Sequence, residues 1–304
     1  MATLHVLLPV LSRCPDDPLL REWLRRGDRL PAAMPGRESV LRAAFEWPDQ
    51  ALPAAALTRE ALAGDAGDTP WLCADPAHVQ PDLAGARMLA CGSLDLDADE
   101  AAELAAPLRP LFGDQGLLLE LTEPARWHLR LQRGTPVPDF DPPAAVLGAD
   151  LLAHLPAGPD GRRWRALFNE AQVILHQHPR NAQRRAAGRA TVNCIWLWGG
   201  GTLPDWVRST RTHVVSEDPL LRALARRAGV LRVPDVSALL ELPRDAHGLL
   251  DLATVEATRI ATALAAGEDA LRRGRIDTID LASDDGSRAR VRHWHRWRFW
   301  RRAS

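Results

Sequence analysis

The sequence predicts an α/β or α+β fold in which a mixed sheet is layered with helices. Short apolar runs rich in β-branched residues alternate with longer segments whose apolar positions recur at helical spacing. Elements that alternate in this way pack as a sheet covered by helices. Hydrophobic residues make up 46% and charged residues 25% of the 304 positions. This composition is typical of a globular chain with a large core.

The first half of the chain predicts several short strands and few helices. We expect an opening strand at residues 3–11, then a helix at 18–26 and an amphipathic piece at 38–46. A further helix is expected at 97–111, because the acidic residues of its first turn complement the helix dipole. The other strands expected in this half are 71–74, 87–91, 117–121 and 127–131.

A long amphipathic helix at residues 160–176 dominates the second half. It ends before Pro179, since the residue preceding a proline disfavours the helical conformation. Its apolar face carries Trp164, Leu167, Phe168, Ala171 and Leu175. The elements expected after it are strands at 194–198, 212–215 and 230–233, helices at 219–228 and 252–273, and a terminal hairpin at 276–292.

One proline-rich stretch is the best candidate for a linker. Residues 134–143 combine glycine and several prolines, which interrupt regular structure. We therefore expect an N-terminal α/β region at 1–133 and a C-terminal α/β region at 144–304. The alternative is one continuous domain.

The cysteines and the hydropathy pattern predict a cytoplasmic protein. Cys14, Cys73, Cys91 and Cys194 are scattered and form no CxxC pair, so neither disulfides nor a structural zinc site is expected. No run approaches the ~18 apolar residues of a membrane span. The apolar N-terminal run has no basic residues before it, so it suits a strand better than a secretory signal.

The C-terminal segment is basic and aromatic in a chain whose net charge is −1. Residues 288–304 contain seven arginines and no acid, interleaved with Trp and Phe. Such a segment can stack on bases or hold phosphates, so nucleic-acid or protein binding is one interpretation. The alternative is a hairpin strand whose Trp side chains pack on the body while Arg neutralises acidic surface. The Asp284-Asp285-Gly286 turn favours this structural interpretation.

The stretch at 176–204 is the most informative part of the chain. It reads HQHPRNAQRRAAGRATVNCIWLWGGGTLP. Three glycines after an apolar strand allow backbone N–H groups to approach an anion, because no Cβ intervenes. Nearby arginines, Arg184 among them, can add charge-assisted hydrogen bonds to a phosphate or carboxylate. The alternative is a strand that ends in a flexible turn beside solvated helix arginines.

Two motifs in this stretch carry a family resemblance. They are His178-Pro179-x-Asn181-x-x-Arg184-x-x-x-Gly188 and Val192-Asn193-Cys194-Ile195 followed by Gly199-Gly200-Gly201. This pattern resembles a segment of archaeal-type, cofactor-independent phosphoglycerate mutases, and Ala74-Asp75-Pro76-Ala77-His78 is a weaker match to another. The variant Ile195-Trp196-Leu197-Trp198, the Trp-Arg-Phe-Trp ending and the length resemble the bacterial RpfE-type regulatory proteins. The resemblance implies an α/β fold of the mutase type.

The chain departs from this family where the metal centre is expected. The resemblance implies an N-terminal Asp-Gly-x-Gly-Asp motif, a nucleophilic Ser beside two metal ions, and a late His-x-x-x-Asp-Glu-x-x-His cluster. Here the first strand runs into Val10-Leu11-Ser12-Arg13-Cys14, and the residues after 240 show no such spacing. Two-metal phosphoryl chemistry requires ligands around two ions ~4 Å apart. We therefore expect no metal cofactor, with Mn or Mg as the alternative if the chain is catalytic.

The leading hypothesis is a phosphoglycerate-mutase-like, non-catalytic protein that binds a small phosphorylated or carboxylated metabolite in a regulatory role. One alternative is an active cofactor-independent phosphoglycerate mutase or phosphatase. A second is nucleic-acid or protein interaction through the Arg/Trp tail, although we expect neither a nucleic acid nor a membrane as partner. The candidate ligand-binding residues are His178, Asn181, Arg184, Asn193, Trp198, Gly199, Gly200, Gly201, Arg208 and Arg211.

Overall fold

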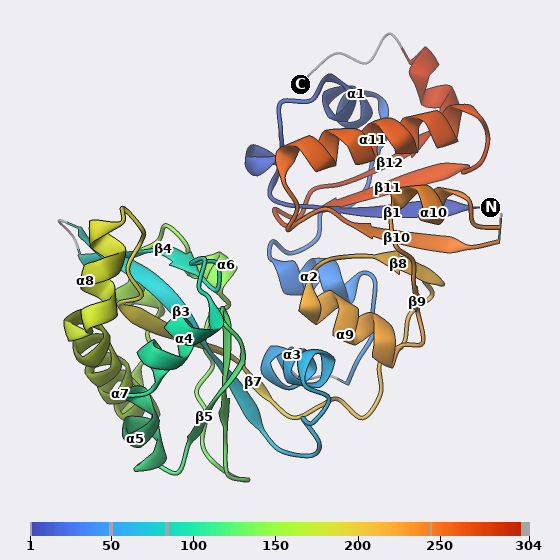
Figure 1. Cartoon of the computed structure of the whole chain (residues 1–304). Coiled ribbons are helices and arrows are strands. Elements are labelled where there is room, and N and C mark those ends of the chain that lie inside the picture. The colour runs from blue at the N-terminus through green and yellow to red at the C-terminus, as the bar shows by residue number, and fades with distance from the viewer. Residues whose placement is uncertain (1, 49–50, 83–84, 244, 299–304) are drawn as a thin grey trace. The chain divides into compact units, whose positions relative to one another are not determined.

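The computed structural model describes residues 2–48, 51–82, 85–243 and 245–298, and shows a mixed α/β protein. The chain divides into two compact units. Unit 1 contains Met1–Pro48 and Asp205–Ser304, and unit 2 is the intervening Asp49–Pro204. The predicted α/β class is confirmed (Figure 1).

Unit 1 is built on a seven-stranded sheet of order β2-β12-β11-β1-β10-β8-β9. β1 is central and runs parallel to β10 and β11, and β8 and β9 continue the parallel part of the sheet. β12 and β2 are added antiparallel at one edge. The strand bounds are β1 Thr3–Leu8, β2 Asp28–Arg29, β8 His213–Val215, β9 Leu231–Arg232, β10 His247–Asp251, β11 Thr278–Ser283 and β12 Arg288–Arg292.

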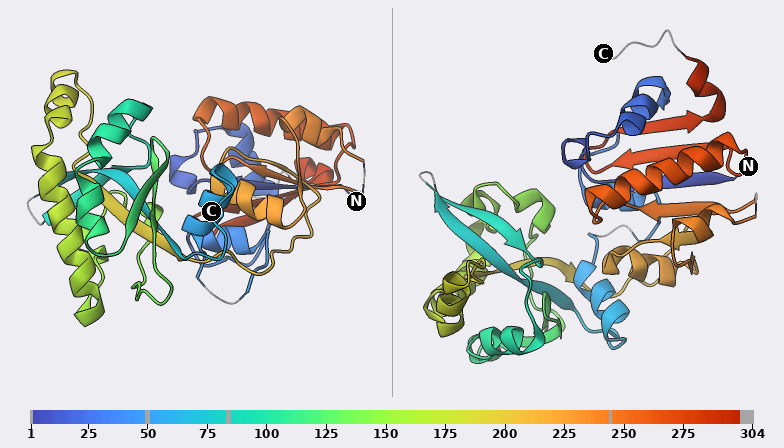
Figure 2. Two further views of the ribbon diagram at one scale, coloured as in Figure 1. Left: turned by 60° about the horizontal axis from the view of Figure 1, so that its bottom comes forward. Right: turned by 45° about the horizontal axis from the view of Figure 1, so that its top comes forward.

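One face of this sheet packs against helices α1 and α11 (Figures 1 and 2). Alternate residues of β1 are buried there, and Trp23 of α1 is only 3% exposed. Asp17 begins α1 by accepting hydrogen bonds from the backbone N–H groups of Leu19 and Leu20. The helical elements of unit 1 are η1 Leu11–Arg13, α1 Pro18–Arg26, α2 Arg37–Arg42, α9 Pro219–Arg227, α10 Val236–Leu240, α11 Ala257–Arg272 and η3 His293–Trp297.

Unit 2 is built on an antiparallel five-stranded sheet in which β3 is the organising strand. β3 pairs with β4, β6 and β7, and β5 pairs with β6. The strand bounds are β3 Trp71–Asp82, β4 Gly85–Cys91, β5 Leu118–Glu123, β6 Arg126–Arg130 and β7 Cys194–Gly201. The helical elements are α3 Ala54–Leu62, α4 Ala98–Ala105, α5 Leu108–Gly113, α6 Pro143–Val146, η2 Leu151–His154, α7 Gly158–Gln177 and α8 Pro179–Ala186.

The apolar face of α7 supplies much of the core of unit 2. Trp164, Leu167, Ala171 and Leu175 are buried with Trp127 in one cluster, so the predicted face is confirmed. The helix ends at Gln177 and α8 begins at Pro179, as the proline predicts. The helix predicted at 97–111 is instead two helices, α4 and α5. Pro107, which lies between them, lacks the backbone N–H that a continuous helix requires.

The predicted boundary at residues 134–143 is not where the contacts divide the chain. β1 has both of its neighbours, β10 and β11, in the last third of the sequence, so the first strand belongs with the C-terminal region. Sequence periodicity does not report strand order, and the division into 1–133 and 144–304 therefore misplaces β1.

Ion pairs with Asp28 of β2 connect the described part of the C-terminal segment to the sheet. Arg292 and Arg298 each contact a carboxylate oxygen of Asp28, at 3.1 and 2.6 Å, and His295 is 1% exposed. The predicted β11–β12 hairpin is confirmed. The expected packing of the Trp side chains is wrong for two of them, since Trp294 is 42% and Trp297 57% exposed. The Trp-Arg-Phe-Trp ending extends beyond the described residues.

None of the helices in the described ranges combines the length and apolar character needed to cross a bilayer.

Unit 2 is expected to fold when it is expressed alone as residues 51–204. Its first helix, α3, and its last strand, β7, meet, because a Cβ built on Gly199 would lie 2.7 Å from the Cβ of Ala54. We expect a single cooperative urea transition by circular dichroism. Fragments 1–133 and 144–304 should lack one, because each separates β1 from its partners. Cooperative unfolding of those two fragments and a disordered 51–204 would contradict the division.

Candidate functional site

The pairing of β3 with β7 brings together the two sequence segments that carry the family resemblance. In this ladder Asp75 lies opposite Trp196, and Cys73 lies opposite Trp198. The central residues of β3 are fully buried, so this part of the sheet is rigidly packed. The Asp-Pro-x-His segment and the Trp-x-Trp-Gly-Gly-Gly segment are therefore neighbours in unit 2, although more than a hundred residues separate them.

Arg126 on β6 joins these segments through a buried carboxylate. Its Nη1 donates to Asp75 Oδ2 at 2.5 Å, and the indole N–H of Trp198 donates to the same oxygen at 2.8 Å. The Asp75 side chain is 1% exposed, whereas that of Arg126 is 21% exposed. The guanidinium carbon of Arg126 lies 5.4 Å from the ring centroid of Trp198, within cation–π range.

The electrostatics of this pair make each partner necessary to the other. Burial raises the pKa of Asp75, while Arg126 and the Trp198 N–H oppose the rise by stabilising the carboxylate. Burial also disfavours the charged form of Arg126, yet Asp75 keeps its pKa above the ordinary value. Neither Nε nor Nη2 of Arg126 bonds to a described residue, and neither atom is fully buried. Two donors of this guanidinium thus have no described protein partner, and the side chain as a whole is partly exposed.

His178 and Asn181 have structural partners in unit 2. His178 is the N-cap of α8, where its Nδ1 accepts from the backbone N–H of Arg180 at 3.2 Å. Asn181 does not cap the helix. Its amide nitrogen donates to the carbonyls of Leu175 and Val192, and its oxygen accepts from the Val192 N–H. Asn181 thus ties the end of α7 to the segment before β7.

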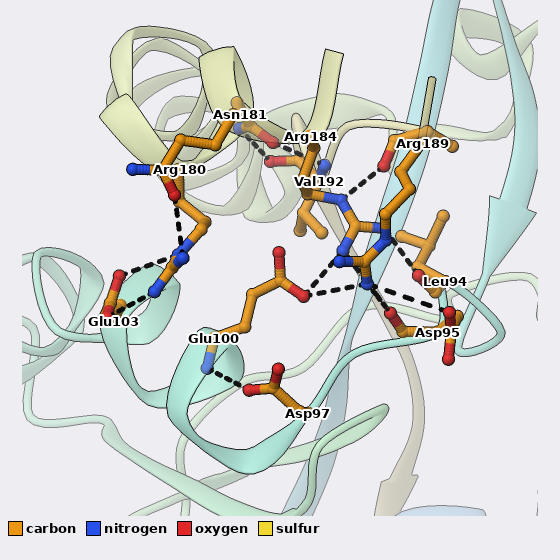
Figure 3. A network of polar contacts seen from close by, with 12 residues as sticks. Leu94, Asp95, Asp97, Glu100, Glu103, Arg180, Asn181, Arg184, Arg189 and Val192 are labelled. Atoms are coloured by element: carbon orange, nitrogen blue, oxygen red, sulfur yellow. Dashed lines mark hydrogen bonds and ion pairs between the residues drawn. The ribbon is translucent and has the colours of Figure 1, made fainter. Parts of the chain in front are cut away.

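Arg184 is buried in a network of internal acceptors (Figure 3). Its nitrogens donate to the carbonyls of Ala190 and Leu94 at 2.6 Å each, and to Glu100 Oε2 at 2.9 Å. Arg189 bonds to the same Glu100 oxygen at 3.0 Å. Arg184 therefore anchors α8 to the start of α4, and its donors are already engaged.

Asn193 fixes the irregularity in β3. Its side chain accepts from the Val79 N–H at 2.8 Å and donates to the Val79 carbonyl at 2.7 Å. The register of β3 against β4 shifts between His78 and Val79. The amide of Asn193 therefore replaces a backbone partner at that bulge.

The glycine triplet continues β7 and is not the expected loop. Its conformation permits a close approach of α3. Gly199 has φ +64°, and a Cβ on it would lie 2.7 Å from the Cβ of Ala54. A Cβ on Gly200 would lie 3.2 Å from a methyl of Val137. The absence of side chains is therefore required by packing.

Arg208 and Arg211 lie in unit 1, while the other candidate residues lie in unit 2. Arg208 is exposed, with its guanidinium 4.9 Å from the Trp206 ring centroid. Arg211 is half-buried, and burial lowers its pKa. Its Nη2 reaches the carbonyl of Ala43 at 3.5 Å.

Unit 1 contains a polar cluster that the sequence analysis missed. Asp251 ends β10 and Asp218 follows β8, and Arg37 from α2 contacts both carboxylates at 2.7 and 3.0 Å. The carboxyl ends of parallel strands share one edge of a sheet, which is where open α/β sheets bind ligands. The available signal was an acidic residue at or within three residues of the end of each of these strands, but its meaning depends on strand order.

The described residues do not provide the metal centre that the family resemblance implies. Across 2–48, 51–82, 85–243 and 245–298, no group of three or more His, Cys, Asp or Glu is arranged to hold a metal ion. At the strand edge of unit 1 the two carboxylates nearest each other already share the guanidinium of Arg37.

Comparison with known proteins places part of this chain near one enzyme class. No protein-family model matches the chain. A segment of 63 residues is 40% identical to a probable 2,3-bisphosphoglycerate-independent phosphoglycerate mutase of Geobacter sulfurreducens, and covers 21% of this chain and 16% of that protein. A segment of 107 residues is 32% identical to the corresponding mutase of Methanothrix thermoacetophila, and covers 33% and 27%.

Two solved structures are similar over most of the chain. One is a protein from Pyrococcus horikoshii, 13% identical, with a TM-score of 0.48, over 95% of this chain and 86% of that one. The other is the cofactor-independent phosphoglycerate mutase of Thermoplasma acidophilum, 18% identical, with a TM-score of 0.42, over 96% and 89%. About a third of the chain is thus homologous to cofactor-independent phosphoglycerate mutases, and the matched segments span 16–27% of the curated relatives named above.

Replacing Arg184 with Met is expected to lower the free energy of unfolding by about 3–5 kcal/mol, because buried carbonyls and Glu100 lose their partner. Arg185→Met, one position along on the exposed side of α8, should change it by no more than about 0.5 kcal/mol. Urea unfolding followed by circular dichroism measures both. Equal, small effects would show that Arg184 is free for another role.

Gly199→Ala is expected to cost about 2–5 kcal/mol of stability, since it combines positive-φ strain with a clash against α3. The matched control is Gly188→Ala. Gly188 has φ +68° but nothing within 4 Å of an added Cβ, so only strain of about 1 kcal/mol remains. The difference between the two midpoints in urea isolates the contribution of the close approach. If the two variants unfold at the same urea concentration, close packing against α3 does not explain the glycine triplet.

Proposed function

We propose that this chain is a phosphoglycerate-mutase-like regulatory protein of the RpfE type that binds a small phosphorylated or carboxylated metabolite. Binding takes place in unit 2 at Arg126, beside Trp198, and requires no metal cofactor. The protein does not catalyse metal-dependent phosphoryl transfer.

The open guanidinium of Arg126 is the observation that carries the proposal. Asp75 accepts a hydrogen bond from this guanidinium, and the Trp198 ring lies beside it. Nε and Nη2 have no described protein partner, on a side chain that is 21% exposed. A planar guanidinium with two adjacent donors free matches a carboxylate or a phosphate edge. Arg184 was the predicted anion ligand, but its donors are satisfied internally.

The neighbouring groups suit an anion more than a cation or a base. The half-buried Trp198 beside Arg126 offers an apolar wall, and Asp75 is turned inward with its Oδ2 already accepting two hydrogen bonds. Oδ1 of Asp75 is buried without a partner among the described residues. The guanidinium of Arg126 is therefore the positive charge at this place, and the exposed Glu123 lies opposite it in the β5–β6 pair.

Several features of unit 1 support a non-catalytic role. Ser12, the first hydroxyl after β1, is exposed on η1, and its side chain hydrogen-bonds to no described residue. A nucleophilic serine requires an adjacent base or metal to lower the cost of deprotonation. The carboxylates at the strand edge are engaged with Arg37.

3-Phosphoglycerate, which carries both a phosphate and a carboxylate, is the probe for this proposal. In EDTA we expect calorimetric binding to the wild-type chain. Arg126→Met should raise Kd by a factor of roughly 10–100, because charge-assisted hydrogen bonds contribute ~1.5–3 kcal/mol. Arg130→Met is the matched control, since Arg130 is an exposed arginine of the same strand, and its Kd should match the wild-type value.

Three results would contradict the proposal. They are no binding to the wild type, equal binding by the wild type and Arg126→Met, and mutase or phosphatase turnover that appears with Mn²⁺ and disappears in EDTA. The last result would establish the active enzyme as the function.

A further inference from the structure

The carboxyl edge of the sheet in unit 1 concentrates acidic side chains. Asp251 ends β10, Asp218 lies three residues beyond the end of β8, and Asp284 follows β11. Because β8, β10 and β11 belong to the parallel part of the sheet, these residues meet at one edge. The side chain of Asp251 is 0% exposed and that of Asp218 is 15% exposed. Buried carboxylates require a cation or several donors to remain ionised.

Arg37 is the cation at this edge. A single nitrogen, Nη2, lies 2.7 Å from Asp251 Oδ2 and 3.0 Å from Asp218 Oδ2. These carboxylates also accept hydrogen bonds from donors nearby in the sequence or directly after the neighbouring strand. Ser216 Oγ donates to Asp251 Oδ2 at 2.8 Å, and the backbone N–H of Leu220 donates to Asp218 Oδ1 at 2.9 Å.

The pKa values of Arg37 and Asp284 shift as expected for a cation surrounded by carboxylates. Burial disfavours a charged Arg37, yet Asp251 and Asp218 raise its pKa above the ordinary value. Burial raises the pKa of Asp284, and Asp251 and Asp218 add to the rise while Arg37 opposes it. Three carboxyl groups, those of Asp218, Asp251 and Asp284, thus act on the guanidinium of Arg37.

We infer that Arg37 is a resident cation that holds the position a divalent metal ion would otherwise take among Asp218, Asp251 and Ser216. Carboxylate and hydroxyl oxygens are hard ligands suited to Mg²⁺ or Mn²⁺. A guanidinium supplies a fixed positive charge that neither dissociates nor titrates at physiological pH. Unit 1 therefore stays folded without metal, and the edge is closed to divalent ions.

This inference is independent of metabolite binding in unit 2. A failure to bind 3-phosphoglycerate would leave it intact.

The test is Mn²⁺ binding to the full chain after EDTA has been used to remove metal and has itself been removed. Binding is measured as the loss of the electron paramagnetic resonance signal of free Mn²⁺. The wild type and Asp251→Asn should bind the same amount of Mn²⁺, because no ion binds at Asp251 while Arg37 is present. Arg37→Met should bind one Mn²⁺, and its Tm should rise by roughly 5–10 °C at saturating metal. The double variant Arg37→Met, Asp251→Asn should lose both effects. Arg42→Met, on the same helix, is the control and should behave as the wild type.

The inference is overturned if the wild type binds Mn²⁺ in a manner that depends on Asp251, or if a folded Arg37→Met binds none. If Arg37→Met is unfolded in EDTA, circular dichroism with added Mn²⁺ decides the matter. Recovery of the native spectrum by Mn²⁺ but not by an equal concentration of Na⁺ supports the resident-cation role. Failure to fold at every Mn²⁺ concentration rejects it.

Discussion

Strands β3 and β7 pair antiparallel across the centre of unit 2, and the positions of the other functional side chains follow from that pairing. Asp75 reaches Trp198 because the two strands are neighbours, and Arg126 reaches Asp75 because β6 pairs with the start of β3. Asn193 maintains the register beyond the bulge by bonding to both backbone groups of Val79. A slip of one residue would turn each of these side chains to the opposite face of the sheet.

Among the described residues, the buried carboxylates of Glu100, Asp251 and Asp75 each contact an arginine, and the three arginines differ in which of their donors remain unpaired. Glu100 and Arg184 are both buried, and the donors of Arg184 are spent on Glu100 and on carbonyl oxygens. Arg37 is shared between two carboxylates at the strand edge. Among these three, Arg126 has a buried partner, Asp75, and two nitrogens, Nε and Nη2, without a described protein partner, on a side chain that is 21% exposed. The Glu100–Arg184 pair is explained by its contribution to stability. In the Asp75–Arg126 pair, the unpaired donors of Arg126 could bind an anion, which stability does not require.

The sequence predicted the elements with local signals more reliably than the arrangement of those elements. The helix at Pro18–Arg26, the break before Pro179 and the hairpin after Ser283 follow from capping, proline and turn chemistry, which act over a few residues. The central position of β1 between β10 and β11 depends on pairings across more than two hundred residues, which periodicity does not encode. The placement of Asp218, Asp251 and Arg37 was missed for the same reason.

The candidate site was predicted in part. The segment around Asn181, Arg184 and Gly199 was identified as exceptional, and each of these residues has a specific contact. Sequence alone does not distinguish an arginine that binds a ligand from one that holds a helix, because both need the same charge in the same region. Arg126 lies in an unremarkable strand motif and becomes visible only when β6 is seen beside Asp75.

Hydrogen–deuterium exchange of the full chain in EDTA, with and without 3-phosphoglycerate, tests the central claim most directly. We expect ligand-dependent protection in peptides that contain Arg126 and residues 196–201, with no change at 178–189 or at the strand edge around Arg37. Protection confined to 178–189, or to the strand ends of unit 1, would show that the metabolite binds elsewhere and would contradict the account.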